Sequence, residues 1–305
     1  MVAAGHSGDC QSGEGQNHDL YLELSGPAVA DVHHNFVQRW NEASERYAPD
    51  GCHGEQGEAD LPFPNQLPEE RGAVTVQIQR TTHPKRYQHG QAPVGGVAFE
   101  IARGERTNYD QYLLAIQSAK RTIYLENQAV EVLEILDALR QALERGVEVV
   151  LVMPAARDLL PNATTAEPHA FDAAWAALGG HQHFTLAGIA GIGDDGQRKP
   201  VHVHSTLMLV DDAWATIGST NLYRWSLFGN GELNAAIWSP EAVREFRIAL
   251  FEEHLAKDTS KLDDSSALRT FCQIALENRL RLAQGDHVWQ GLAFSLEPAV
   301  QELSI

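Results

Sequence analysis

The chain has 305 residues, enough for one large domain or two modest ones. Its 23 Lys and Arg against 41 Asp and Glu give a formal charge of −18, and so acidic a surface repels a phosphate backbone, so we expect no nucleic-acid partner. The three cysteines have neither metal-type spacing nor a disulfide pattern, and no stretch approaches the ~20 apolar residues of a membrane span. The N-terminus lacks the apolar run of a signal peptide, so we expect a cytoplasmic protein, with peripheral membrane contact left open.

The N-terminal region, residues 1–46, is expected to hold a disordered start, one strand and one helix, too little for a domain alone. Residues 1–16 are rich in Gly and Ser and are predicted to be disordered, whereas residues 20–24 alternate apolar and polar side chains as a half-buried strand does. After Gly26 and Pro27, apolar side chains recur at helical spacing, at Val29, Val32, Phe36 and Trp40. Residues 47–72, rich in Glu, Gly and Pro, are interpreted as a linker.

Residues 73–260 alternate strand and helix patterns, which predicts an α/β domain with a mixed β-sheet flanked by helices on both faces. Residues 261–305 are assigned to a C-terminal helix, over 265–284, and a tail. The predicted strands of the domain's first part cover 74–78, 122–125, 149–153 and 184–187, and its predicted helices cover 109–120, 130–145 and 170–178, with another beginning at Ser239-Pro240.

The stretch that carries chemistry runs from His202 to Trp238. Its pattern predicts a strand, a tight turn at Asp211-Asp212, a second strand, a loop, and a third strand that begins at Glu232. His204 and Thr206 are two residues apart on the first strand, so we expect them to share a face. The second strand ends in Gly218-Ser219-Thr220-Asn221, a loop of small and polar residues that can bring several hydrogen-bond donors close to a phosphate.

These residues resemble the phospholipase D superfamily, whose motif is His-x-Lys-x4-Asp followed by Gly-Ser-x-Asn. His204 and Asp211 match the first element, Gly218, Ser219 and Asn221 match the second, and Glu232 matches an acidic residue that supports the histidine in single-motif members. The stretch from Tyr124 to Gln128 (YLENQ) resembles the strand that opens the family's repeat. The similarity covers roughly residues 97–256. A match at several spaced positions is more specific than a match to one short motif.

The resemblance implies a covalent mechanism on phospholipid phosphodiesters, as in phospholipase D and cardiolipin synthase-like enzymes. One histidine attacks phosphorus and a second protonates the leaving alcohol; water or another alcohol then takes the phosphoryl group. His204 would fill one of these roles, and Glu232 would hold its ring. Ser219, Asn221 and the residue at Thr206 would face the phosphoryl oxygens, and no metal or cofactor is implied. Asp211 occupies the motif's aspartate position and is expected to be mainly structural.

Two departures from the family pattern bear on activity. Thr206 stands where the family has lysine, and by analogy with a lost oxyanion donor this costs about 10²–10³ in rate; Arg198 and Lys199 replace that charge only if their loop folds back. Only one motif is present, and residues 18–45 resemble the end of a first repeat. We therefore expect a second chain, or an N-terminal half outside this sequence, to supply the other histidine.

Alternatives remain at this stage. The chain could be a degenerate or truncated non-catalytic member that keeps the fold and binds phosphate, or a nuclease of the same superfamily, which the charge of −18 disfavours. His204 could also be an ordinary core or turn histidine. His202 and His204 beside Asp211 and Asp212 could ligate a metal, but the family pattern explains the same residues better.

Overall fold

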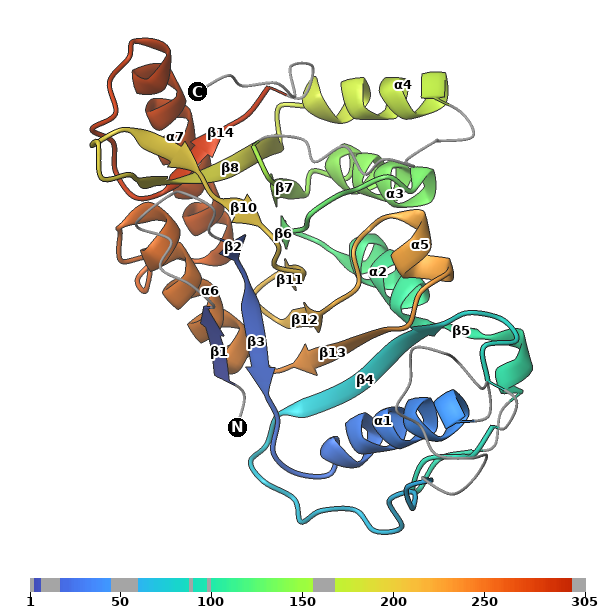
Figure 1. Ribbon diagram of the computed structural model, residues 1–305. Helices are drawn as coiled ribbons and strands as arrows, with labels where there is room; N and C mark the ends of the chain where they lie inside the picture. Colours follow the sequence, from blue (N-terminus) through green and yellow to red (C-terminus); the bar gives the residue numbers. More distant parts are fainter. Residues whose placement is uncertain are drawn as a thin grey trace.

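The computed structural model describes residues 3–6, 17–44, 60–87, 90–97, 100–155 and 168–297 (Figure 1). Its centre is a mixed sheet in which the described residues contribute ten strands, in the order β14-β8-β7-β6-β11-β12-β13-β4-β5, with β9 paired to β8. The strands are β4 (Thr75–Thr82), β5 (Glu105–Arg106), β6 (Thr122–Glu126), β7 (Glu148–Val152), β8 (Phe184–Ile192), β9 (Arg198–Pro200), β11 (Leu207–Val210), β12 (Trp214–Gly218), β13 (Glu232–Trp238) and β14 (Ala293–Ser295). Pairs β6–β7 and β7–β8 are parallel and the other pairs antiparallel.

Helices cover both faces of this sheet, which confirms the predicted fold class. Side chains alternate across the central strands: Ile123 and Leu125 of β6 pack in one core, and Tyr124 between them packs in the other. The first core lies under α2 (Thr107–Ser118), α3 (Leu133–Glu144) and α4 (Pro168–Gly179), and the second under α6 (Pro240–Leu255) and α7 (Asp264–Ala283). The short helices are α5 (Arg224–Phe228) and the 3-10 turn η1 (Ile101–Arg103).

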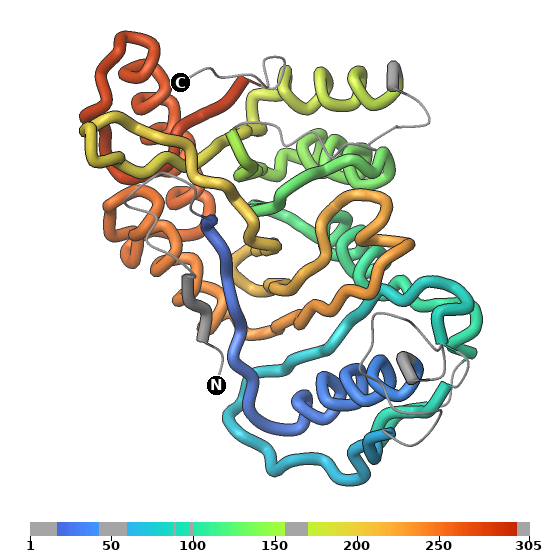
Figure 2. The backbone as a smooth tube through the Cα atoms, viewed as in Figure 1, coloured from blue at the N-terminus to red at the C-terminus, as the bar shows by residue number. Residues whose placement is uncertain are grey.

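The N-terminal segment packs against the sheet. It forms β2 (Asn17–His18), β3 (Leu20–Glu23) and α1 (Val29–Ser44), and β2 pairs in parallel with β10 (His202–Val203). Figure 2 shows this blue segment running beside the yellow strand segment near residue 202. Residues 3–6, predicted to be disordered, instead form β1 (Ala3–His6), because the edge of β3 accepts an antiparallel partner there. The rest of 1–16 and residues 45–59, which include the first part of the predicted linker, lie outside the described residues.

The strands and helices predicted from 74 onward are present, and two strands differ in extent or continuity, while β5, α5 and β14 were not predicted. Strand β8 extends five residues beyond the predicted 184–187, because β9 and β14 pair with its second half. The predicted strand through His204 and Thr206 is interrupted between β10 and β11. The backbone N–H groups of His204 and Ser205 donate to the carbonyl of His18 there, at 2.9 and 3.0 Å. The chain therefore bonds to the N-terminal segment over 202–205 and rejoins the large sheet only at Leu207.

Helix α6 begins as the sequence predicts, since Ser239 Oγ accepts from the N–H of Ala242 and Pro240 opens the first turn. In the described part of the chain, no helix is both long and apolar enough to span a membrane.

Candidate active site

His204 lies on the interruption between β10 and β11, with its side chain half exposed. Its backbone is fixed by the bond to His18, and its Nδ1 lies 2.9 Å from Oδ2 of Asp19. Because the carboxylate accepts from Nδ1, the ring presents Nε2 as the nitrogen available for chemistry. Residues 18 and 19 thus set both the backbone and the ring of His204, although they come from the N-terminal segment.

Glu232 occupies a different place from the one expected. Its two oxygens accept hydrogen bonds from Ser219 Oγ at 2.6 Å and Ser226 Oγ at 2.7 Å. The sequence assigned Glu232 to hold the His204 ring, but Asp19 is the carboxylate that contacts His204. Glu232 instead positions the Ser219 hydroxyl at the end of β12, and Ser219 accepts in turn from the N–H of Leu233 at 3.2 Å.

Asn221 connects toward the histidine through a second chain of polar groups. Its Nδ2 donates to Oε1 of Gln128 at 3.4 Å, and Nε2 of Gln128 lies 3.2 Å from Nε2 of His202. The rings of His202 and His204 are 6.1 Å apart between centroids. The buried Oδ1 of Asn221 makes no hydrogen bond to any described residue. The loop 218–221 and the two histidines therefore border one polar region.

Thr206 does not share the exposure of His204. Thr206 is 3% exposed, and its backbone carbonyl accepts a hydrogen bond from the N–H of Gly218 at 3.2 Å. Gly218 has to be glycine because of β13 on its other side, where a Cβ would lie 2.3 Å from the carbonyl oxygen of Leu233. The expectation that residues 204 and 206 share a face rested on a continuous strand, and the structure interrupts that strand at 204–206.

Neither basic residue upstream stands in for the family's lysine. The guanidinium of Arg198 donates to the carbonyls of Ala190 and Trp289 and stacks on the Trp289 ring. Nζ of Lys199 lies 3.4 Å from the Asp195 carboxylate. Both cations are thus engaged away from His204.

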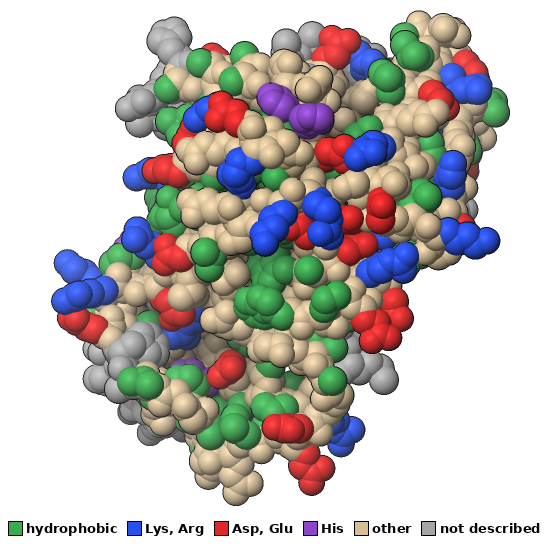
Figure 3. All heavy atoms as spheres, turned by 180° about the vertical axis from the view of Figure 1, so that it is seen from behind, with side chains coloured by type: hydrophobic (Ala, Val, Ile, Leu, Met, Phe, Trp, Pro, Cys, Tyr) green, Lys and Arg blue, Asp and Glu red, His purple; other side chains and the backbone are tan. Residues whose placement is uncertain are grey.

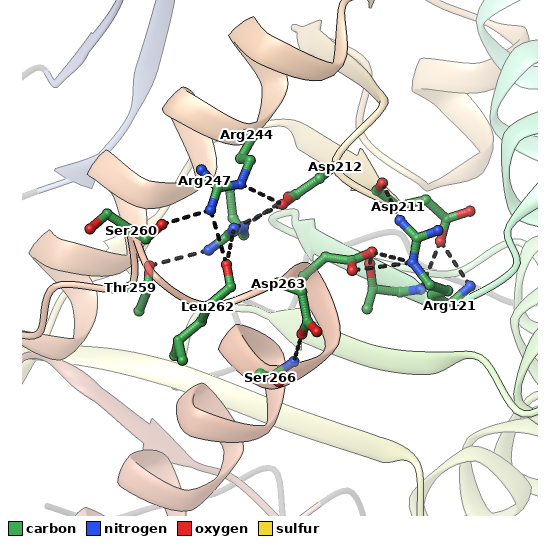
Figure 4. Close-up of polar contacts among 12 residues, drawn as sticks. Arg121, Asp211, Asp212, Arg244, Arg247, Thr259, Ser260, Leu262, Asp263 and Ser266 are labelled. Carbon is green, nitrogen blue, oxygen red and sulfur yellow. Dashed lines mark hydrogen bonds and ion pairs between the residues drawn. The ribbon is translucent and has the colours of Figure 1, made fainter.

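Asp211 lies at the opposite end of β11 from His204, in the cluster drawn in Figure 4. Its φ is 56°, and its carboxylate accepts from the N–H groups of Lys120, Arg121 and Thr122 at 2.8–2.9 Å. The next residue, Asp212, receives two hydrogen bonds from Arg247 at 2.8 Å each. This arrangement joins the β11–β12 turn to the start of β6 and to α6, and it puts Asp211 outside the polar region around His204.

A buried network around Glu126 escaped the sequence analysis. Oε2 of Glu126 accepts from His18 Nε2 at 2.8 Å and from Ser205 Oγ, and Oε1 accepts from the Tyr124 hydroxyl at 2.7 Å. The Tyr124 oxygen also lies 3.0 Å from Nδ1 of His254. Since the phenol gives its single proton to Glu126, we assign the proton of the second contact to Nδ1 of His254.

The charge state of Glu126 follows from these contacts. Burial alone would raise its pKa, but the charge and hydrogen bond of His18, the charge of His254 and the Ser205 hydroxyl together hold the pKa below its usual range. Ligand atoms of His18, Glu126 and His254 lie within 4.8 Å of one another, as in a metal site. Yet three donors already occupy the carboxylate, so the donor set fits a proton-bonded network better than an ion. The YLENQ stretch was the sequence signal for Glu126, but nothing local predicted its partners.

Comparison with known proteins agrees with the sequence motif. Residues 112–255 match the family described as cardiolipin synthase, PLD-like domain. Cardiolipin synthase 1 of Staphylococcus epidermidis is 25% identical over 259 residues, covering 82% of this chain and 43% of that protein. The major cardiolipin synthase ClsA of Bacillus subtilis is 26% identical over 246 residues, covering 78% and 40%. The chain thus spans less than half the length of these relatives.

Among solved structures, the phospholipase D family member Nuc from Salmonella typhimurium is 21% identical with a TM-score of 0.37, covering 57% of this chain and 90% of that one. The family match over 112–255 includes the strand of Glu126, His204 and the loop of Ser219 and Asn221, and it coincides with the motif identified in the sequence. Residues 112–255 of the chain form a domain of the phospholipase D superfamily.

Proposed function

We propose that this chain carries one histidine half-site of an enzyme that cleaves or transfers phospholipid phosphodiesters. The observation that supports it best is the pair formed by His204 and Asp19, in which Nδ1 is engaged at 2.9 Å and Nε2 is left for phosphorus. The relatives named as cardiolipin synthases support a phosphatidyl transfer at family level. Peripheral contact with a membrane would bring the lipid to this site.

In the proposed reaction, Nε2 of His204 attacks phosphorus and the bond from phosphorus to the leaving alcohol breaks. A second histidine protonates that alcohol, and an incoming alcohol or water then takes the phosphoryl group from His204. The second histidine would come from another chain or from an N-terminal half. Asp19 stabilises the charged ring, and Asn221 donates to a phosphoryl oxygen through the second N–H of its amide. Ser219 donates to another by turning its hydroxyl proton from Glu232 to the phosphate.

The second candidate is a non-catalytic member that binds phosphate. It is favoured by the buried Thr206 at the lysine position and by the engagement of Arg198 and Lys199 elsewhere. A nuclease is disfavoured by the charge of −18. On the face shown in Figure 3, acidic side chains are interspersed with the basic ones, which does not suit a long anionic strand.

The test is phosphodiesterase and phosphatidyl-transfer activity on a chromogenic phosphodiester and on phosphatidylglycerol. His204→Ala is compared with the wild type and with a matched control, His33→Ala, on the exposed side of α1. Turnover that His204→Ala abolishes and His33→Ala leaves intact supports the catalytic proposal. A silent wild type that binds phosphate in a His204-dependent way would instead support the non-catalytic candidate.

A further inference from the structure

A pocket of about 450 Å³ opens where the N-terminal helix meets the edge of the sheet. Figure 1 shows α1 lying along β4 in this region. The pocket is lined by the C-terminal part of α1, by the end of β4 with the loop that follows it, and by the loop between α5 and β13. The lining side chains that matter here are those of Arg39, His83, Lys85, Arg86 and Asn230.

The pocket borders the candidate active site directly. Glu232, which holds Ser219, pairs with Thr81 in the register of β13 and β4. The next residues along these two strands, Gly231 and Thr82, already line the pocket. Asn230 lines it too, and its Nδ2 lies 3.5 Å from Oε1 of Glu232. A ligand in the pocket would therefore sit beside the group that positions the Ser219 hydroxyl.

The charge of the lining is opposite to that of the protein. Its residues include two arginines, a lysine and a histidine but no Asp or Glu, in a chain with a formal charge of −18. Arginines elsewhere commonly pair with carboxylates, as Arg80 does with Glu105 and Arg247 with Asp212. The guanidinium groups of Arg39 and Arg86, by contrast, form no ion pair with a carboxylate of the described residues.

The backbone is shaped to hold these cations at the pocket. The guanidinium of Arg39 packs against Gly231, where an added Cβ would lie 2.5 Å from its Nη1. In the opposite wall, Lys85 adopts a φ of 63°, and its N–H donates to the carbonyl of Ala102 at 2.9 Å. A left-handed lysine is an unfavourable backbone state that its surroundings have to stabilise. The loop that carries Lys85 is therefore held to η1 at this wall of the pocket.

From these observations we infer that the pocket binds a second phosphate, carried by the anionic headgroup of a glycerophospholipid, next to the phosphodiester at His204. Guanidinium groups match phosphate oxygens in geometry and charge, and two of them in one pocket favour a ligand with net negative charge. A phosphocholine headgroup carries a compensating cation that Arg39 and Arg86 would repel. The reaction role of this subsite rests on the proposed function, whereas the binding itself does not.

The test measures binding by calorimetry with the full chain and soluble dihexanoyl lipids. Dihexanoylphosphatidylglycerol, dihexanoylphosphatidylcholine and inorganic phosphate are titrated into the wild type, Arg39→Gln/Arg86→Gln and His204→Ala. The control Arg140→Gln/Arg269→Gln removes the same charge from α3 and α7. We expect the wild type to prefer the glycerol lipid and the pocket variant to lose about tenfold or more in affinity, while the control stays within about twofold.

The inference would be overturned if the pocket variant kept its affinity for the lipid, or if the control lost as much affinity as the pocket variant. It would also be overturned if inorganic phosphate bound as tightly as the lipid and depended equally on both arginines, because the pocket would then be a site for the free anion. Melting curves of the variants confirm that they are folded. If the lipid binds through the arginines in His204→Ala while the wild type shows no turnover, the subsite stands and the catalytic proposal alone fails.

Discussion

Nε2 of His18 lies 2.8 Å from Oε2 of Glu126, and both side chains are fully buried although 108 residues separate them in the sequence. The same carboxylate accepts from the hydroxyl of Ser205, the residue that follows the candidate nucleophile His204. The carbonyl of His18 meanwhile holds the backbone of residues 204 and 205. One buried pair therefore joins the N-terminal segment, strand β6 and the site.

Replacing Glu126 by glutamine should destabilise the fold strongly. A glutamine has one oxygen to accept hydrogen bonds where the carboxylate receives three donors, and it leaves His18 without its counter-ion. Breaking a buried pair in this way costs about 3–5 kcal/mol. Urea denaturation gives the free energy of unfolding, with Glu144→Gln on the exposed side of α3 as the control. A change of less than about 1 kcal/mol in Glu126→Gln would show that the network contributes little to stability.

The same network predicts a dependence of stability on pH. The pKa of Glu126 is lower in the folded state than its ordinary value of 4.5. A group of this kind stabilises the folded state fully above the unfolded pKa, and its contribution is lost as the pH falls from there toward the folded pKa. The free energy of unfolding of the wild type should therefore decline below about pH 4.5 more steeply than that of Glu126→Gln. Parallel curves for the two proteins would contradict this assignment.

Local sequence patterns predicted the helices and strands, but they did not predict the contacts of the candidate active site. Continuous apolar runs predicted β6 and β7, and a capping serine with a following proline predicted the start of α6. The partners of His204 and Glu126 could not be read locally, because Asp19 and His18 reach them from the far end of the sequence. The interruption of the strand at 204–206 also results from a contact distant in sequence. The apolar pattern of a strand continues there, but the backbone bonds to His18 instead.

Asp19 should matter for catalysis more than for stability. It contacts His204 at 2.9 Å, but the His204 side chain is half exposed, so the ion pair contributes at most about 1 kcal/mol. In catalytic triads, losing the carboxylate that orients the histidine ring and fixes its tautomer lowers turnover by about 10²–10⁴. We expect Asp19→Ala to lower kcat by at least about 10² with little change in KM or melting temperature. Equal losses in Asp19→Ala and in the exposed control Asp110→Ala would rule out a specific role.

Restoring the family's lysine should raise activity. Thr206 offers only a neutral hydroxyl, whereas an ammonium would stabilise the charge that develops on the phosphoryl oxygens. We expect Thr206→Lys to raise the His204-dependent kcat by about 10² on a chromogenic phosphodiester. Thr206→Met, similar in length but uncharged, is the matched control for the added bulk at this buried position. An equal change in both variants would mean that packing, and not charge, limits the reaction.

Substitutions of Asp211 should lower the stability of the fold without changing the activity of the site. Its carboxylate accepts from three backbone N–H groups that open β6, and its positive φ of 56° suits Asp or Asn better than Ala. We expect Asp211→Ala to lower the free energy of unfolding by about 2–4 kcal/mol, and Asp211→Asn by less, because Asn tolerates this backbone and keeps one acceptor. Because β11 separates Asp211 from His204, kcat of the folded variants should equal that of the wild type. A loss of turnover in Asp211→Ala at unchanged unfolding free energy would instead give Asp211 a role in catalysis.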